Sequence, residues 1–84
     1  MFTKSVIVNL PTDSEARPVA VMVQISSRYD SRIFVSSNNK KVNAKSIMGM
    51  MSMGFANGDE LSIEAEGEDA EEAVEAMAKY IESK

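Results

Sequence analysis

The sequence predicts an α+β fold of the open-faced β-sandwich type, in which a four-stranded, mostly antiparallel sheet is covered on one face by three helices. Three observations predict it. The residue patterns follow the order β-α-β-β-α-β-α along the chain. Glu60–Glu66 alternates apolar and polar residues, so the sheet has one apolar face that must be covered. The chain has 84 residues, which suits one small domain that spans 1–84.

The first strand is predicted at Lys4–Leu10. This segment is rich in β-branched residues, and Val6, Val8 and Leu10 occupy every second position. Pro11–Ser14 then supplies turn-forming residues that end the strand.

The first helix is predicted to open at Glu15–Pro18 and to continue to about Ser27, because proline is well tolerated in a first helical turn. Residues that recur with a helical period are expected on its inner face, namely Val19, Met22, Val23 and Ser26. The residues expected on its other faces are Ala16, Ala20, Val21 and Gln24.

A hairpin and a short helix follow a loop at Arg28–Asp30. The hairpin strands are predicted at Arg32–Ser36 and Lys41–Asn43, joined by a polar turn. Ser46 then precedes the apolar run Ile47–Met53, which is long enough for about two helical turns.

The last strand and helix have the clearest patterns. In Glu60–Glu66 the apolar residues at 61, 63 and 65 face inward, and Gly67 ends the strand. Asp69 and Glu72 have the spacing of a capping box at the start of the final helix. Its inner stripe is predicted to hold Ala70, Ala73, Val74, Met77, Ala78 and Ile81.

Composition excludes several classes of function. The chain has no histidine and no cysteine, which excludes histidine- or cysteine-based catalysis and zinc binding. We therefore expect no enzymatic activity, no metal and no cofactor. A net charge of −4 argues against direct nucleic-acid binding, and no apolar run is long enough to span a membrane. Without cysteines or a signal-peptide pattern, we expect a cytoplasmic protein.

Ser46 and the apolar run after it carry the strongest functional signal. The hydroxyl of Ser46 is expected to cap the following helix, and a phosphate on it would lie beside free backbone N–H groups. The run holds more apolar bulk than the inner face of so short a helix needs, so some of its side chains are expected to face a partner. Those side chains are Ile47, Met48, Met50 and Met51. The alternative reading is a plain capping serine beside core methionines.

Two segments together indicate a family. Ala16-Arg17-Pro18 lies at the start of the first predicted helix, and Lys45-Ser46-Ile47-Met48-Gly49 lies at the start of the second. With the element order, this combination resembles the HPr family, the small phosphocarriers of the bacterial sugar phosphotransferase system, over essentially the whole chain. The resemblance implies the HPr-like open-faced sandwich.

Glu15 departs from the family pattern. In the phosphocarriers a histidine precedes Ala-Arg-Pro and carries the phosphoryl group, so Glu15 at this position implies loss of that activity. The chain is then similar to the regulatory, Crh-type members of the family. Glu15 either suits the positive end of the helix dipole or mimics the charge of phosphohistidine.

The resemblance implies a regulatory role in carbon catabolite repression. Ser46 matches the serine that HPr kinase/phosphorylase phosphorylates, and the phosphorylated form is expected to bind a transcription factor of the catabolite control protein A type. The expected partner-binding residues are Arg17, Ala20, Val21, Gln24, Ile47, Met48 and Met51. The alternative is a phosphocarrier of the phosphoenolpyruvate-dependent sugar phosphotransferase system, diverged or mutated at Glu15, with other proteins of that system as partners.

Overall fold

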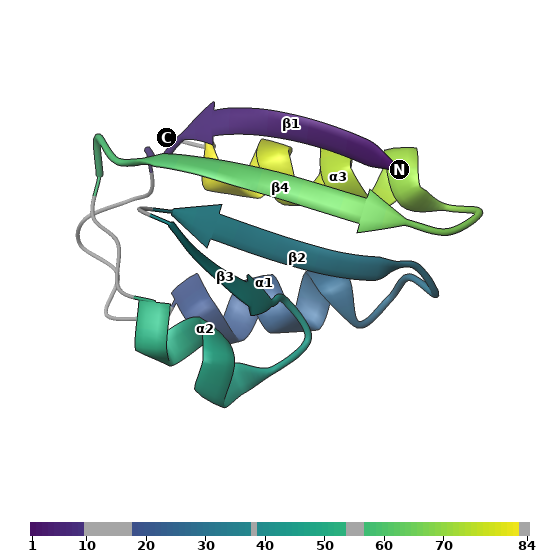
Figure 1. Cartoon of the computed structure of the whole chain (residues 1–84), viewed down its shortest axis with the longest axis horizontal. Helices are drawn as coiled ribbons and strands as arrows, with labels where there is room; N and C mark the ends of the chain where they lie inside the picture. The colour runs from purple at the N-terminus through teal and green to yellow at the C-terminus, as the bar shows by residue number, and fades with distance from the viewer. Residues whose placement is uncertain (10–17, 38, 54–56, 83–84) are drawn as a thin grey trace.

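The computed structural model describes residues 1–9, 18–37, 39–53 and 57–82. Four strands and three helices follow one another in the predicted order (Figure 1). They are β1 (Phe2–Ile7), α1 (Pro18–Ser26), β2 (Arg32–Ser37), β3 (Lys40–Asn43), α2 (Ile47–Met53), β4 (Glu60–Glu66) and α3 (Ala70–Ile81).

The sheet has the strand order β1-β4-β2-β3, and each neighbouring pair is antiparallel. The predicted bounds of the first strand, Lys4–Leu10, are wrong at both ends. Phe2 already pairs with Ala65, and the ladder ends at Ile7 opposite Glu60, so Val8 and Asn9 lie beyond the strand. The partner strand decides where β1 begins, and this partner is distant in the sequence. Leu10, the predicted end, lies outside the described residues.

The helices lie on one side of the sheet and leave its other side open (Figure 1). α3 packs on β1, β4 and β2, whereas α2 packs on β3 and α1. Between the sheet and the helices lies one core. Its buried apolar side chains include Val6, Met22, Ile33, Val35, Met50, Leu61, Ile63, Val74, Met77 and Ile81. In the described ranges no helix has both the length and the apolar character that crossing a membrane requires.

The inner face of α1 differs from the prediction. Met22, Ile25 and Ser26 are its buried residues, and Ile25 was not predicted to face the core. Val21, predicted on another face, is partly buried against the core. α1 packs on both α2 and α3, so it buries side chains over a wider arc than a single apolar stripe would indicate.

The apolar stripe of α3 is confirmed, but the predicted capping box is wrong. Asp69 stands at the N-cap position, yet its side chain makes no capping hydrogen bond. The carboxylate instead accepts the backbone N–H of Asp30 at 2.9 Å, the N–H of Ser31 at 3.0 Å and the hydroxyl of Ser31. These bonds, the Ser31 hydroxyl above all, lower the pKa of Asp69 below its usual value. They tie the loop after α1 to the start of α3.

Candidate functional site

Ser46 caps α2 as predicted. Its Oγ accepts the backbone N–H of Gly49 at 3.1 Å, and its carbonyl oxygen accepts the N–H of Met50 at 2.9 Å. A Cβ at position 49 would lie 3.3 Å from Oγ, so glycine leaves room beside the hydroxyl. The side chain is partly exposed. Ser46 is thus held in place by the helix it begins and is still open to solvent.

The turn before Ser46 is well anchored. Asn43 Oδ1 accepts the N–H of Lys45 at 2.8 Å, and the Asn43 carbonyl accepts the N–H of Ser46 at 3.0 Å. The Nζ of Lys45 donates to the carbonyl oxygen of Tyr29 at 2.6 Å, in the loop after α1. The segment that carries Ser46 is therefore fixed both within the turn and to the loop after α1.

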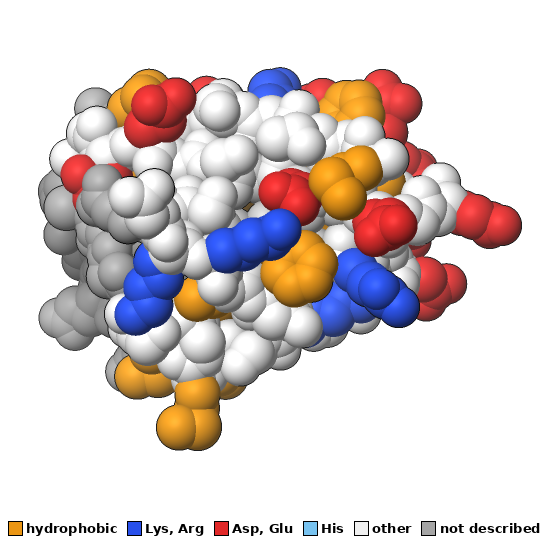
Figure 2. Space-filling model, viewed as in Figure 1, with side chains coloured by type: hydrophobic (Ala, Val, Ile, Leu, Met, Phe, Trp, Pro, Cys, Tyr) orange, Lys and Arg blue, Asp and Glu red, His pale blue; other side chains and the backbone are white. Residues whose placement is uncertain are grey.

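Three large apolar side chains of α2 point to solvent. Ile47 is 49% exposed, Met48 81% and Met51 66%. Met50, on the opposite face, is fully buried in the core. Figure 2 shows hydrophobic side chains projecting from the lower edge of the molecule, where Figure 1 places α2. Three large apolar residues exposed beside one another form a patch, so the exposure that docking requires is present. That these side chains face a partner stays a prediction.

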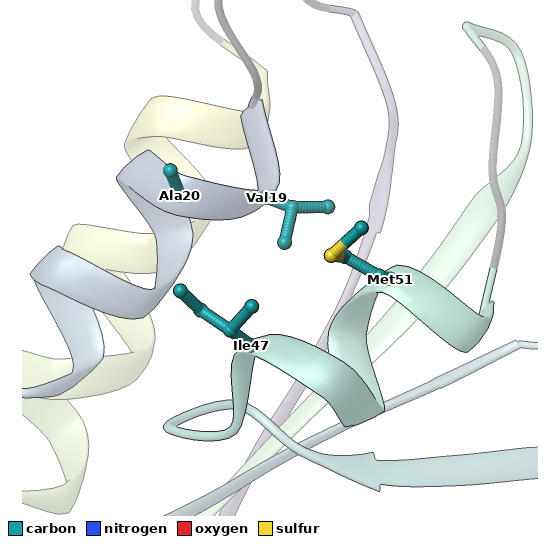
Figure 3. Close-up of a pocket in the computed structure, with 4 residues that line it drawn as sticks. All are labelled: Val19, Ala20, Ile47 and Met51. Atoms are coloured by element: carbon teal, nitrogen blue, oxygen red, sulfur yellow. The ribbon is translucent and has the colours of Figure 1, made fainter.

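A shallow apolar groove runs between α1 and α2. It has a volume of about 400 Å³ and is lined by Val19 and Ala20 of α1 and by Ile47 and Met51 of α2 (Figure 3). Of the predicted partner-binding residues, the structure thus brings Ala20, Ile47 and Met51 together. We call the groove together with Met48 the α1–α2 surface.

The remaining predicted residues are placed differently. Met48 and Gln24 are exposed but do not line the groove, and Val21 packs against the core. Val19, which was predicted to face inward, packs against the core and also lines the groove. No local pattern identifies Val19, because its position in the groove depends on how α1 lies against α2. Glu15 and Arg17 lie outside the described residues, and their roles stay predictions.

Comparison with known proteins decides the family. The family model described as "PTS HPr component phosphorylation site" matches residues 2–83. The chain belongs to the HPr family. Among members of this family, it is 46% identical over 82 residues to the HPr-like protein Crh of Halalkalibacterium halodurans, covering 98% of each chain. It is likewise 46% identical over 81 residues to the HPr-like protein Crh of Bacillus subtilis, covering 96% of this chain and 95% of the relative.

Solved HPr structures have the same fold. HPr-C-His from Thermoanaerobacter tengcongensis superposes with a TM-score of 0.90 at 46% identity, over 99% of this chain and 93% of that one. The phosphocarrier protein HPr from Bacillus anthracis gives 0.88 at 46% identity, over 95% of each chain. The four-stranded antiparallel open sheet with three helices is therefore the HPr fold. Within the part of the chain that the structure describes, no group of three or more acidic residues is arranged to hold a metal ion.

Proposed function

We propose that this HPr-family chain is a non-catalytic regulator of carbon catabolite repression. In this proposal an HPr kinase/phosphorylase phosphorylates Ser46, and the phosphorylated form binds a transcription factor of the catabolite control protein A type. The observation that carries the proposal is the position of Ser46. Ser46 is partly exposed, and its hydroxyl caps the helix whose side chains Ile47, Met48 and Met51 are exposed to solvent. The likeness to the HPr-like Crh proteins supports it.

Phosphorylation is compatible with the cap. The Oγ of Ser46 acts toward Gly49 as an acceptor, and a phosphoester keeps this bridging oxygen while it removes only the hydroxyl proton. The modified residue would add about −1.5 to −2 charges and three acceptor oxygens. In this proposal, arginine or lysine side chains of the partner pair with those oxygens, and the apolar side chains of the α1–α2 surface supply the buried area.

The direct test is incubation of the purified protein with ATP and an HPr kinase/phosphorylase, followed by intact mass measurement and mapping of the modified site. We expect one added phosphate. Ser46→Ala should abolish the added phosphate, whereas Ser52→Ala should keep it. Ser52 serves as the matched control because it is an exposed serine of the same helix, and its Oγ donates to the Gly49 carbonyl at 2.7 Å. An unmodified protein, with a known substrate phosphorylated in parallel, would reduce Ser46 to a structural cap.

A phosphocarrier role is the second candidate, because the matching family model is described by the phosphorylation site of the HPr component. It requires phosphoryl transfer from phosphoenolpyruvate through Enzyme I to this chain. Labelled phosphoenolpyruvate with Enzyme I separates the two candidates, since the regulatory proposal predicts no transfer and the carrier role requires it.

A further inference from the structure

The methionine side chains of this chain divide sharply by exposure. Among the methionines whose side chains the structure describes, three are completely buried, namely Met22, Met50 and Met77. On α2, by contrast, Met48 and Met51 are 81% and 66% exposed, and Met51 points into the groove between α1 and α2 (Figure 3). Met1 is also exposed, but it precedes β1, whereas α2 packs on β3 at the opposite edge of the sheet.

We propose that Met48 and Met51 are sites of reversible oxidation that switch off docking at the α1–α2 surface. The inference rests on the proposed function, in which the phosphorylated form binds the transcription factor through this surface. It adds that the kinase contacts the same surface when it reaches Ser46, which caps α2. The co-reactant is a hydroperoxide. Its O–O bond breaks and an S–O bond forms, the thioether sulfur gives up two electrons and becomes a sulfoxide, and the peroxide is reduced to water or an alcohol.

The sequence confines this chemistry to methionine. The chain has seven methionines and no cysteine, so no thiol competes for peroxide. Access then selects among the thioethers, because a fully buried sulfur meets peroxide only when the structure opens. Met50 and Met51 are neighbours in one helix, yet one is 0% and the other 66% exposed. The fold itself therefore separates reactive from protected positions within a single turn.

Oxidation of Met51 would place a polar sulfoxide in the apolar groove of the α1–α2 surface. The side chain of Met51 converges with those of Ile47 and Val19 on an apolar groove (Figure 3). A sulfoxide oxygen there is hydrogen-bonded to water while the surface is free. When an apolar partner covers the surface, the oxygen loses this water and gains no new hydrogen bond, which disfavours binding. Met48, almost fully exposed beside the groove, lies within reach of the same partner.

The first test resolves oxidation site by site. The folded protein is treated with dilute hydrogen peroxide, and its peptides are analysed by mass. Met48 and Met51 should gain one oxygen each, together with the exposed Met1, while Met22 and Met77 stay unmodified until the protein is unfolded in urea. Equal rates at exposed and core positions in the folded protein would overturn the proposed selectivity.

The second test measures the initial rate of Ser46 phosphorylation by HPr kinase/phosphorylase before and after peroxide. The oxidised protein should be phosphorylated about tenfold more slowly, the scale expected for burying one polar group without a partner. Treatment with the two epimer-specific methionine sulfoxide reductases and a thiol should restore the rate.

Substitution of individual methionines shows which of them cause the slower phosphorylation after peroxide. In Met48→Leu/Met51→Leu the ratio of treated to untreated rates should be close to one, whatever the untreated rate is. Met77→Leu removes a core methionine and should keep the full loss after peroxide. An oxidised wild-type protein that is phosphorylated as fast as the untreated one would overturn this inference and leave the proposed function intact. An untreated protein that the kinase does not phosphorylate would overturn both.

Discussion

The Oγ of Ser26 lies 2.9 Å from the carbonyl oxygen of Ala44 and donates to it, although the two residues are 18 positions apart. Both are fully buried. The Ser26 proton is shared with the Val23 carbonyl at 3.0 Å. In the reverse direction, the Nζ of Lys45 donates to the carbonyl of Tyr29 at 2.6 Å. One bond thus joins the last residue of α1 to the turn before Ser46, and a second joins the loop after α1 to the same turn. The position of Ser46 therefore depends on α1 and on the loop that follows it.

Ser26→Ala should destabilise the protein by about 1–3 kcal/mol, because it leaves the buried Ala44 carbonyl without its side-chain donor. Urea unfolding measures the loss, and Ser46 phosphorylation should slow with it. The adjacent Ser27→Ala is the matched control. Ser27 directly follows α1 and is exposed, and its Oγ donates to the nearby Val23 carbonyl at 2.7 Å, so we expect a change below about 0.5 kcal/mol. Equal losses in both variants would contradict the role of the Ser26–Ala44 bond.

Ser46→Ala should lower the free energy of unfolding by about 1 kcal/mol through loss of the cap on the Gly49 N–H. Ser46→Asp supplies another capping oxygen and should be close to the wild type in stability. Thermal or urea unfolding of the three proteins checks the order. If Ser46→Ala were as stable as Ser46→Asp, the cap would contribute nothing.

Ile47→Thr should weaken binding to the phosphoserine-dependent partner by about tenfold, since it removes apolar area from the groove. Ile7→Thr provides a matched control, because Ile7 is 51% exposed and Ile47 is 49% exposed. Ile7, however, lies on β1 and does not line the groove. Titration calorimetry with the phosphorylated proteins measures both. A similar loss at Ile7 would show that exposed apolar area in general, and not the groove, sets affinity.

Gly67→Ala should be more destabilising than Gly58→Ala. Both glycines have positive φ, 147° and 98°, so alanine is strained at either position by about 1–3 kcal/mol. Only at Gly67 would the new Cβ also collide, at 2.5 Å from Ser31 Oγ and 2.8 Å from Ser31 Cα, whereas position 58 is open. Denaturant unfolding should therefore show an additional loss of about 1–3 kcal/mol for Gly67→Ala. Equal losses would mean that the Ser31 loop moves aside freely.

Asp69 should make stability depend on pH at acidic values. Its pKa in the folded state is lowered from 3.8 by the bonds from Ser31 and Asp30, so folding favours the carboxylate. Its contribution is fully present above the unfolded-state pKa and is lost as pH falls through the lowered folded-state pKa. The stability difference between wild type and Asp69→Asn should be largest near neutral pH and should shrink as both are titrated below about pH 4.

Urea midpoints measured from about pH 7 down to about pH 2 test this. Glu71→Gln, which changes an exposed carboxylate in the first turn of the same helix, serves as the control. A difference between wild type and Asp69→Asn that stays constant over this range would show that the carboxylate form is not favoured by folding.

The elements that were predicted well are those whose signals are local. α2 has the predicted bounds because Ser46 supplies the cap directly before its apolar run. β4 also has the predicted bounds, since strict alternation separates its buried and exposed residues. In α3 the apolar stripe recurs with the helical period, and all six predicted residues are buried. Each of these signals lies within a dozen neighbouring residues.

The elements that were predicted less well depend on partners distant in the sequence. Asp69 has the spacing of a cap, but the N–H groups of Asp30 and Ser31 compete for its carboxylate and prevail. Val19 packs against the core, as its place in the helical period indicates, but α2 lies beside it and makes it part of a groove as well.

Local sequence patterns are therefore sufficient to predict the order of the elements, the capping role of Ser46 and the excess of apolar bulk after it. These features follow from backbone hydrogen bonding and from the period of the side chains along one segment. Long-range packing, in contrast, places Val19 and Ala20 of α1 along the groove, brings Ser26 to the Ala44 carbonyl, and leaves Met48 and Met51 exposed to solvent. The packing of one helix against another depends on long-range contacts, and a pattern within one segment does not contain them.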